Sequence, residues 1–233
     1  MTDTKNYVAV ILARGGSKEI PSKNITEFCN KPLIYWTINQ CLKAEGVKEV
    51  WVSSDSDEIL KISESYGAKS IKRPKELSKD ESSSESAWLH AIKFIEDNFY
   101  SIDLVIAPQV TSPLRESEDL ERGIIDFEKG NFDSMFSGSL IKDFFFWEKN
   151  EKSDLESINY DHMHRKRRQD INEKYIENGS FYLFKPETLR TYNNRFGESV
   201  GLTLMESWKT YEIDSSLDLR VCSSLMQEFL IKE

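Results

Sequence analysis

Continuous apolar runs alternate along the chain with segments whose apolar residues recur at helical spacing. Residues 7–13 (YVAVILA) form one such run, the pattern of a strand buried on both faces of a parallel sheet. The segment 32–46 follows, with a proline near its start, a glycine at its end, and Ile34, Ile38, Cys41 and Leu42 on one helical face. The first 46 residues therefore predict a strand, a loop and a helix.

The alternation continues as far as residue 140. Further strands are predicted at 47–54, 69–72, 102–109 and 132–140, and helices at 57–67, from Ser83 or Ser84 onwards, and within 111–130. Repeated βα units of this kind predict an α/β fold with an open, mostly parallel sheet and helices on both faces. We assign residues 1–140 and 175–233 to this domain.

Residues 141–174 depart from the pattern. They begin with three phenylalanines and a tryptophan (DFFFWEKN, 143–150) and end in a basic segment (HRKRRQD, 164–170). A segment this small has no core of its own, so its aromatic residues need another surface to cover, which a second subunit would provide. We expect a protruding arm that forms a homodimer.

The chain rejoins the domain after residue 174. In order, we expect the apolar segment 179–184 (GSFYLF), a short helix, and the segments 200–205 (VGLTLM) and 209–213 (KTYEI). An amphipathic helix follows from about residue 216. Helical spacing predicts that the inward residues of the last helix are Leu217, Val221, Leu225 and Phe229.

Composition narrows the classes of function. The chain has 233 residues, 39% of them hydrophobic, and a formal net charge of −9, which argues against nucleic acid as a partner and requires a local cationic site for any small anion. The start MTDTKNYVAV has no basic region followed by a long apolar run, and no segment approaches the roughly 20 apolar residues of a membrane span. We expect a cytoplasmic protein without a membrane partner.

Cysteine and histidine give little sign of a structural metal site. Cys29, Cys41 and Cys222 are odd in number and widely spaced, which argues against zinc. His162 and His164 could bind a metal on a strand, but no further His or Cys stands nearby, and a polar loop is favoured.

The loop after the first strand carries the strongest candidate chemistry. Gly15 and Gly16 allow a tight turn with exposed backbone N–H groups, and the side chains that follow the strand add fixed charge and an amide: Arg14, Lys18, Lys23 and Asn24. The pattern matches neither a Walker loop nor the dinucleotide motif Gly-x-Gly-x-x-Gly. It favours a polyphosphate ligand over the alternative, a Gly-Gly turn with surface lysines.

Two acids near the other end of the chain are candidates for a cation. Glu212 and Asp214 stand at i and i+2 and would share one face of a strand, where they repel each other unless a cation lies between them. Magnesium binds through such carboxylates together with phosphate oxygens. The alternative is a solvated strand end in which Asp214 caps the next helix, with Asp218 one turn further on.

A third cluster offers a cation, an amide and a phenol in Arg168, Asn178 and Tyr182. Such a set suits a polar sugar that carries a carboxylate. Alone, the Asn-Gly pair at 178–179 is above all a turn signal.

Taken together, these motifs resemble the CMP-sialic acid synthetase family, the acylneuraminate cytidylyltransferases. The matching pieces follow the family order over nearly the whole chain: ARGGSKEIPSKN (13–24), RPKELSKDESSS (73–84), QVTSPLR (109–115), RRQD (167–170), YIENGSFY (175–182) and EIDSSLDL (212–219). The resemblance implies a nucleotide-diphospho-sugar transferase-like, Rossmann-like fold. It also implies transfer of CMP from CTP to the anomeric hydroxyl of a sialic acid or related nonulosonic acid, with Mg²⁺ and release of pyrophosphate.

The resemblance also implies roles for individual residues. The triphosphate and part of the nucleoside would be held by Arg14, Gly15, Gly16, Ser17, Lys18, Lys23 and Asn24. Cytosine and ribose would be recognised by Arg73 and the serines Ser82 to Ser84. The sugar would contact Gln109, Asn178 and Tyr182, together with Arg168 from the arm of a partner subunit. Glu212 and Asp214 would hold Mg²⁺, and the residues expected to act in catalysis are Arg14, Lys18, Lys23 and Asp214.

Two departures from the family pattern and two rival functions stand beside this interpretation. Glu19 replaces a common Gly, and Glu212 replaces a common Asp, which lengthens that carboxylate arm and favours Asp214 as the main ligand. One rival is a nucleotidyltransferase of the same fold for another sugar acid, such as a Kdo-type acid, or for a sugar phosphate. The other is a regulatory nucleotide-binding protein without catalysis, which the presence of both distal acids disfavours.

Overall fold

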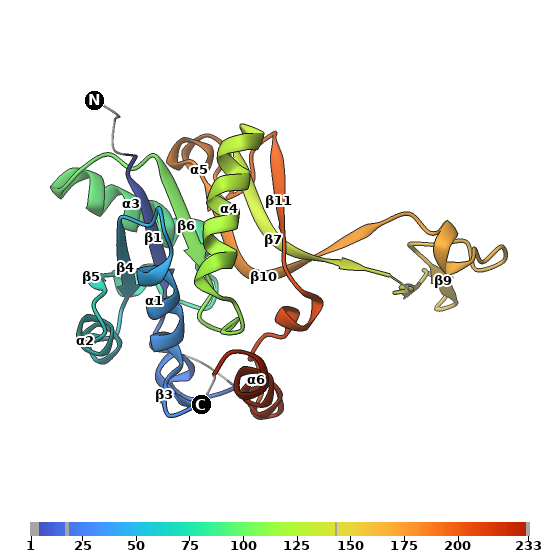
Figure 1. Ribbon diagram of the computed structural model, residues 1–233, viewed down its shortest axis with the longest axis horizontal. Helices are drawn as coiled ribbons and strands as arrows, with labels where there is room; N and C mark the ends of the chain where they lie inside the picture. The colour runs from blue at the N-terminus through green and yellow to red at the C-terminus, as the bar shows by residue number, and fades with distance from the viewer. Residues whose placement is uncertain (1–4, 17–18, 143, 232–233) are drawn as a thin grey trace.

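The centre of the protein is a twisted sheet with helices on both faces (Figure 1). The structure is a computed structural model that describes residues 5–16, 19–142 and 144–231. Among these residues the main sheet has seven strands in the order β11-β7-β10-β6-β1-β4-β5. Their bounds are β1 (Tyr7–Leu12), β4 (Glu49–Ser54), β5 (Lys69–Lys72), β6 (Leu104–Pro108), β7 (Ser134–Ile141), β10 (Lys174–Phe184) and β11 (Val200–Leu204).

The sheet is parallel except for β10. Strand β1 pairs in parallel with β4 and β6, β4 with β5, and β7 with β11, whereas β10 lies antiparallel between β6 and β7. The expected open, mostly parallel sheet is therefore confirmed. Strand β10 runs in the opposite direction because the chain re-enters the sheet from the outer end of the arm.

Side chains of β1 divide the core into two layers. Ala9 and Ile11 face the layer covered by α1 (Leu33–Lys43), α2 (Asp57–Ser65), α4 (Ser117–Gly130) and α6 (Ser216–Phe229). Val8 and Val10 face the layer covered by α3 (Ser84–Asn98) and α5 (Pro186–Tyr192). This alternation requires apolar residues at every position of the strand, which explains the continuous run in the sequence.

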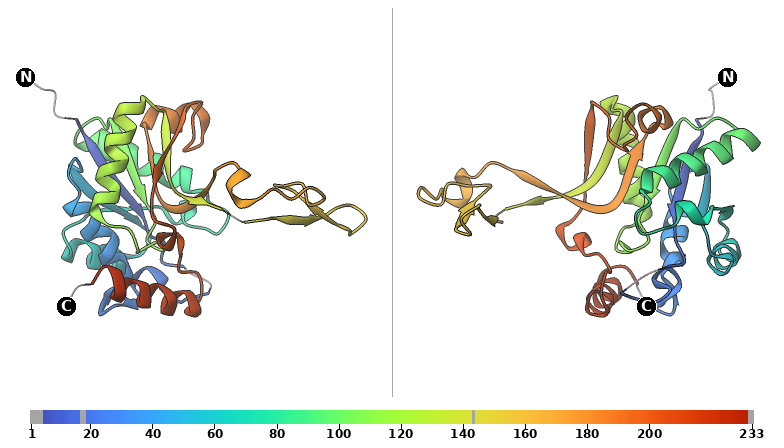
Figure 2. Two further views of the ribbon diagram at one scale, coloured as in Figure 1. Left: turned by 45° about the vertical axis from the view of Figure 1, so that its right-hand side comes forward. Right: turned by 180° about the vertical axis from the view of Figure 1, so that it is seen from behind.

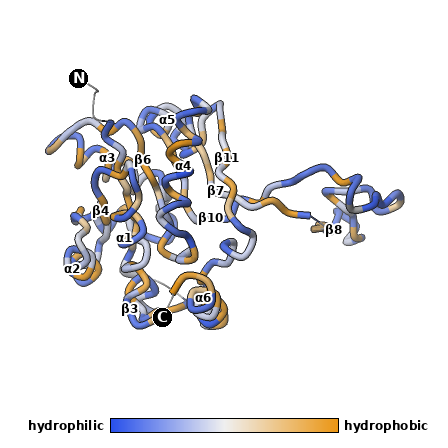
Figure 3. Tube along the Cα trace, in the orientation of Figure 1, coloured by the Kyte–Doolittle hydropathy of each residue, from blue (hydrophilic) through white to orange (hydrophobic). Residues whose placement is uncertain are grey.

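Shorter elements complete the chain. They are the strands β2 (Glu27–Phe28), β3 (Lys31–Pro32), β8 (Trp147–Lys149) and β9 (Leu155–Ser157), and the 3-10 turns η1 (Lys23–Ile25), η2 (Lys75–Leu77), η3 (Arg168–Asp170) and η4 (Ser207–Thr210). Hydrophobic residues concentrate along the strands of the main sheet (Figure 3). No helix in the described parts of the chain has both the length and the apolar character needed to cross a membrane.

Helix starts follow the hydroxyl signals in the sequence. The Ser83 side chain accepts a hydrogen bond from the backbone N–H of Ser86, so α3 begins at Ser84 as predicted. At α6 the cap is Ser215, which forms a reciprocal capping box with Asp218. The alternative in which Asp214 caps this helix is wrong, and the Asp214 side chain lies free of the cap.

The inward face of α6 differs from the prediction. Leu217 is 58% exposed and Phe229 is 50% exposed, whereas Cys222 and Met226 are buried. The helix is rotated by about one residue from the expected orientation. Phe229 stacks on Trp208 at 4.7 Å between ring centroids instead of entering the core.

The segment 209–213 is not a strand. Residues 207–210 form η4, and Tyr211, Glu212 and Ile213 continue as irregular chain without a ladder partner. Ile213 is nevertheless fully buried, and its N–H donates to the backbone oxygen of Thr111 at 2.8 Å. Lys209 is buried as well, but Tyr211 between them is 52% exposed, so the alternation expected of a strand is absent.

Residues 141–174 extend away from the sheet (Figure 2). Strands β7 and β10 continue side by side to the pair Ile141 and Lys174, and the short hairpin β8–β9 lies beyond them. Large apolar side chains are exposed here, among them Phe144, Trp147, Leu155 and Met163.

The packing of α4 on β10 gives a test of the core. A Cβ at Gly123 would lie 2.8 Å from Phe181 Cε2, and Phe181 is fully buried. We expect Gly123→Ala to destabilise the fold. Overpacking of a core costs about 1–3 kcal/mol, which exceeds the gain of about 1 kcal/mol in helix propensity. Denaturant unfolding measures the difference. Gly16→Ala is the matched control, since a Cβ there meets nothing within 4 Å, and stability equal to wild type in Gly123→Ala would contradict the packing.

Candidate active site

A cleft of about 590 Å³ opens at the carboxyl ends of β1, β5 and β6. Segments that follow these strands supply its lining: Arg14 after β1, Arg73 after β5 and Thr111 after β6. In open α/β sheets ligands bind at this edge. The predicted residues that also line the cleft are Lys23, Asn24, Ser82, Ser83, Ser84 and Asp214.

The loop after β1 is held by side chains from three other segments. Arg14 Nη1 donates to Asp80 Oδ1 at 2.6 Å, and the N–H of Gly15 donates to Asp55 Oδ1 at 2.9 Å. Asn24 Nδ2 donates to the backbone oxygen of Arg14 at 2.9 Å. The Asn24 amide therefore holds the loop in place, and the Arg14 guanidinium crosses the cleft to the 73–84 segment.

The two glycines of this loop differ in their surroundings. A Cβ at Gly15 would lie 3.1 Å from Ser56 Cβ, so close approach of the backbone to α2 favours glycine there. A Cβ at Gly16 would meet no heavy atom within 4 Å. The predicted nucleotide-binding residues Ser17 and Lys18 lie outside the described residues.

Lys23 joins the first loop to the end of the chain. Its Nζ donates to Asp214 Oδ1 at 2.9 Å and to the backbone oxygen of Ile213 at 3.1 Å. The Lys23 side chain is 15% exposed, whereas that of Asp214 is 66% exposed. A predicted cation and a predicted acid thus meet at the cleft, and the Asp214 carboxylate still faces solvent.

Arg73 is 5% exposed, and its Nε has no hydrogen-bond partner among the described residues. Burial lowers the pKa of Arg73, while the nearby Asp55 carboxylate opposes that shift. A buried, unpaired donor at the wall of a cleft favours a ligand with an acceptor atom. Beside it, Ser82 Oγ donates to the Glu76 backbone oxygen at 2.9 Å.

A bulge in β10 brings two further predicted residues together. The β7–β10 register shifts between Glu177 and Tyr182, and Gly179 in this interval has φ of +66°. A Cβ at Gly179 would lie 3.6 Å from Glu212 Oε2 and 3.8 Å from the Gln109 amide. Gln109 and Glu212 therefore converge on this glycine.

Asn178 and Tyr182 are buried and bonded within the protein. Asn178 Oδ1 accepts from Ser137 Oγ at 2.6 Å and from the N–H of Ser180 at 3.1 Å. Tyr182 donates to Glu177 Oε1 at 2.6 Å, and burial raises its pKa well above the ordinary value. Neither residue lines the 590 Å³ cleft. Their geometry thus shows a part in shaping the bulge, while sugar contact stays a prediction.

Arg168 belongs to η3, in the arm. The other candidate residues that the structure describes lie in the domain, whereas η3 belongs to the segment 141–174, which protrudes from it (Figure 2).

The two candidate metal ligands have separate partners. Thr111 Oγ1 donates to Glu212 Oε1 at 2.5 Å, and Asp214 pairs with Lys23. Asp218 accepts hydrogen bonds from Ser215, which lower the pKa of Asp218 and assign it to the helix cap. Within the described ranges, no group of three or more His, Cys, Asp or Glu side chains is arranged to hold a metal ion.

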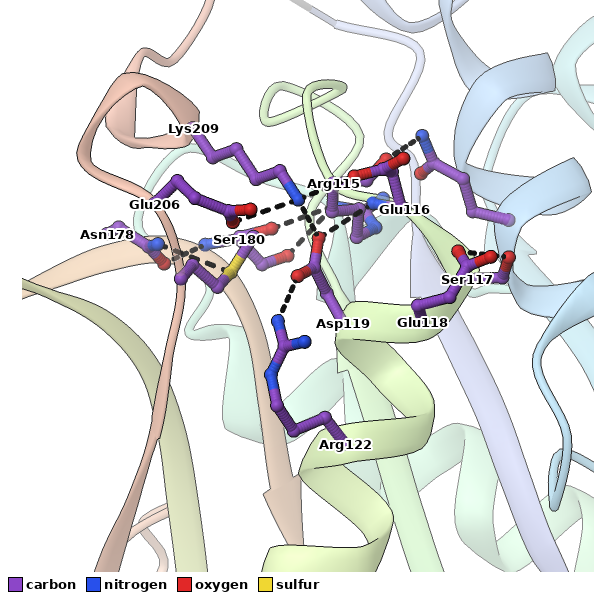
Figure 4. Close-up of polar contacts among 12 residues, drawn as sticks. Arg115, Glu116, Ser117, Glu118, Asp119, Arg122, Asn178, Ser180, Glu206 and Lys209 are labelled. Carbon is purple, nitrogen blue, oxygen red and sulfur yellow. Dashed lines mark hydrogen bonds and ion pairs between the residues drawn. The ribbon is translucent and has the colours of Figure 1, made fainter. Parts of the chain in front are cut away.

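A buried polar cluster surrounds Lys209, which precedes Glu212 by three residues in the chain (Figure 4). Lys209 contacts the carboxylates of Glu116 and Asp119, both at 2.8 Å, and of Glu206 at 3.1 Å. Next to it the guanidinium of Arg115, which is 1% exposed, donates to the backbone oxygens of Gln109, Ser112 and Ser180 and to Thr37 Oγ1. Burial lowers the pKa of Arg115 to about 10.

Comparison with known proteins identifies the family. The family model described as cytidylyltransferase matches residues 8–227, which is nearly the whole chain. This chain belongs to the cytidylyltransferase family. The resemblance inferred from the motifs is thereby confirmed at the level of the family.

Relatives of this cytidylyltransferase-family chain carry two substrate names. N-acylneuraminate cytidylyltransferase A of Danio rerio is 35% identical over 219 residues, 93% of this chain and 49% of that protein. The chain thus spans about half the length of that relative. Pseudaminic acid cytidylyltransferase of a Campylobacter jejuni strain is 32% identical over 182 residues, 76% of this chain and 77% of that protein.

A solved structure has the same fold as this chain. CMP:2-keto-3-deoxy-manno-octonic acid synthetase complexed with CTP matches with a TM-score of 0.73, over 97% of this chain and 100% of that one. The identity is 18%, so the match shows a shared fold and nothing finer.

Sequence reasoning missed the carboxylates that hold the cytidylyltransferase cleft together. Asp80 and Asp55 stand in polar segments, and nothing local distinguishes them from solvated acids. Lys209 gave no signal because its partners Glu116 and Asp119 are 93 and 90 residues away along the chain. The one available signal was Asp119, an acid in the first turn of a helix, which favours a capping role.

Lys23 gives the sharpest test of the cleft. Lys23→Met keeps the apolar stem and removes the charge. We expect the affinity for CTP to fall about 10- to 100-fold, because a charge-assisted hydrogen bond contributes about 1.5–3 kcal/mol. Isothermal titration measures it. Stability should change by less than about 1 kcal/mol, since Asp214 is largely exposed and regains water.

Lys93→Met is the control for lost charge. Lys93 pairs with Asp97 on the surface of α3, and its side chain is 75% exposed. CTP affinity equal to wild type in both variants would show that Lys23 serves only to pair with Asp214.

Proposed function

We propose that this chain transfers CMP from CTP to the anomeric hydroxyl of a nonulosonic acid and releases pyrophosphate. The observation that carries the proposal is the convergence of Arg14, Lys23 and Asp214 on one cleft at the carboxyl edge of the sheet. Membership of the cytidylyltransferase family supports the nucleotide and the type of transfer. The names of the relatives support the class of sugar.

The cations of the cleft suit the charge that this reaction develops. The anomeric hydroxyl oxygen bonds to the α-phosphorus and loses its proton to water, the bond from that phosphorus to the bridging oxygen breaks, and pyrophosphate departs. Arg14 and Lys23 each hold a carboxylate oxygen at 2.6 and 2.9 Å. Phosphate oxygens are acceptors of the same kind and can take over these bonds, so the cations then stabilise the departing group.

Magnesium fits the acids beside these cations. Asp214 offers an exposed carboxylate at the cleft, and Glu212 Oε2 faces Gly179 while the other oxygen, Oε1, accepts from Thr111. One or two carboxylates together with phosphate oxygens are a usual magnesium set, so fewer than three protein ligands suffice. When bound there, Mg²⁺ would neutralise charge on the triphosphate. We therefore assign Asp214 as the main ligand and Glu212 as the second.

The region around the β10 bulge is our candidate for the sugar. Gln109 and Glu212 converge on Gly179, whose lack of a side chain leaves room between them. We place the sugar against Gln109, with Asn178 and Tyr182 supporting the bulge from beneath. Arg168 would be supplied by the arm of a second subunit. N-acylneuraminate and pseudaminate lead the candidates because relatives named for them match most of the chain.

A homodimer is the assembly that the arm favours. Phe144, Trp147, Leu155 and Met163 are between 43% and 75% exposed, an unusual density of apolar surface for a small excursion. A second copy of the chain can cover this surface with its own copy of the same surface, because a two-fold symmetric interface is self-complementary. We place the protein in the cytoplasm, a proposal supported by its three free cysteines, Cys29, Cys41 and Cys222.

A substrate panel tests the proposed reaction. CTP and Mg²⁺ are combined with N-acetylneuraminate, its deaminated form, legionaminate, pseudaminate or Kdo, and released pyrophosphate is measured. We expect release with a nonulosonic acid, poor release with UTP, ATP or GTP, and none in EDTA. Asp214→Asn is the control for background hydrolysis. Release with Kdo alone would favour the rival sugar acid, and no release with any sugar would refute the proposal.

The arm predicts a dimer that weakens when its apolar surface is charged. In Leu155→Asp combined with Met163→Asp, we expect the dissociation constant of the dimer to rise at least 10-fold, because each change desolvates a carboxylate at the interface. Sedimentation velocity measures it. Leu217→Asp on α6, where Leu217 is 58% exposed, is the control. A monomeric wild type would refute the homodimer.

A further inference from the structure

Lys209 is the most deeply buried ammonium group among the described lysines and takes no direct part in the cleft. Its side chain is 1% exposed and is surrounded by Glu116, Asp119 and Glu206 (Figure 4). Burial opposes the charge on Lys209, but the hydrogen bonds that its ammonium donates to these carboxylates raise the pKa of Lys209 above the ordinary value. The group is therefore a fixed cation with three acidic partners.

Two of the three partners of Lys209 belong to the start of α4. Glu116 is the N-cap of this helix, and Asp119 returns its side chain to the Glu116 N–H at 2.8 Å. Asp119 is 1% exposed and also pairs with Arg122 on the outer side. The ammonium of Lys209 is thus anchored to a rigid helix end through the capping box.

Lys209 itself stands three residues before Glu212 and five before Asp214. The segment that connects them has no ladder to hold it. Lys23 holds the far end of the segment at Ile213 and Asp214, and Thr210 Oγ1 donates to Ser139 Oγ at 3.2 Å. Two further bonds are from the Ile213 N–H to the Thr111 backbone oxygen at 2.8 Å and from Thr111 Oγ1 to Glu212 Oε1 at 2.5 Å. Both lead to the 109–115 loop, which Arg115 fixes from inside.

The same loop leads directly into α4, so the ion pairs and the hydrogen bonds close a ring. One side of the ring runs from Thr111 to Glu116 along the chain, and the other runs from Lys209 to Ile213. Removal of the Lys209 charge opens this ring at one of its two cross-links. The acids would then be carried by a segment that has lost the ion pairs at its start and keeps only the bonds of Thr210, Glu212, Ile213 and Asp214.

We propose that Lys209 is a positioning residue that fixes the segment of Glu212 and Asp214 for binding of a divalent cation with the nucleotide. The inference rests on the proposed function, because it assigns these acids to the metal. Lys209 acts through the backbone and does not contact the ligand. Outer groups that orient metal ligands commonly change metal affinity about 10- to 100-fold.

Two variants test the role. Lys209→Met removes the charge at similar length. Lys209→Met combined with Asp119→Asn also removes the buried acid that would be left without its partner, while the Asn oxygen can still accept from the Glu116 N–H. The control is Arg122→Met, which removes another cation that contacts Asp119 but lies outside the 206–214 segment, with a side chain that is 44% exposed.

The first measurement needs no ligand. In hydrogen exchange of the protein in EDTA, we expect the Ile213 amide of both Lys209 variants to exchange at least about 10-fold faster, while amides of β1 keep wild-type rates. The second is titration of Mn²⁺ into protein with CTP, where the apparent dissociation constant should rise about 10-fold. CTP affinity measured in EDTA should change less than about 2-fold, and Arg122→Met should match wild type in all three.

Each outcome decides the inference. Wild-type exchange at Ile213 together with wild-type Mn²⁺ affinity in the double variant would overturn it. Loss of folding in both variants would assign Lys209 to global stability and overturn it as well. If the wild type binds neither CTP nor Mn²⁺ with CTP, the proposed function fails first, whereas normal wild-type binding with unchanged variants refutes only the role of Lys209.

Discussion

The ion pair between Lys23 and Asp214 joins two segments that are 191 residues apart in the chain. Its geometry depends on the parallel sheet, because only parallel strands deliver successive loops to one edge. Arg14, Arg73 and Thr111 reach the cleft from that edge, and Asp214 arrives from the far end of the chain. The cleft thus gathers cations from several segments beside a few acids. Because of this local concentration of cations, a protein with net charge −9 can present a site for an anion.

Buried charge is used where regular structure is missing. The chain between β11 and α6 crosses the carboxyl edge of the sheet without ladder hydrogen bonds, so it is attached by the charged groups of Lys209 and Lys23 and by the backbone bond of Ile213. Arg115 serves the neighbouring loop in the same way, through carbonyl oxygens. Desolvating such groups is costly, and they remain charged because nearly every donor has an acceptor in place.

Local patterns predicted what local forces decide. The continuous run at 7–13 became β1, since burial on both faces leaves no polar position, and Ser83 marked the start of α3 because its hydroxyl caps the helix. The α6 stripe was misjudged, because the capping box at Ser215 and the stacking of Phe229 on Trp208 set the rotation of the helix. The alternating pattern at 209–213 resembles a strand, but no neighbouring strand pairs with it. The same distinction applies to the site. Arg14 and Asp214 could be predicted because they lie within recognisable motifs, whereas the pairing of Lys209 with Asp119 depends on the completed fold.

Strands β7 and β10 are shared between the sheet and the arm, from Glu177 opposite Gly138 out to Lys174 opposite Ile141. Side chains on a ladder alternate between its two faces, so lengthening both strands by two residues leaves every outer residue on its original side. Lengthening each by one turns the whole outer portion over. Evolution can therefore change the length of this appendage without disturbing the cleft, provided that each strand gains or loses an even number of residues.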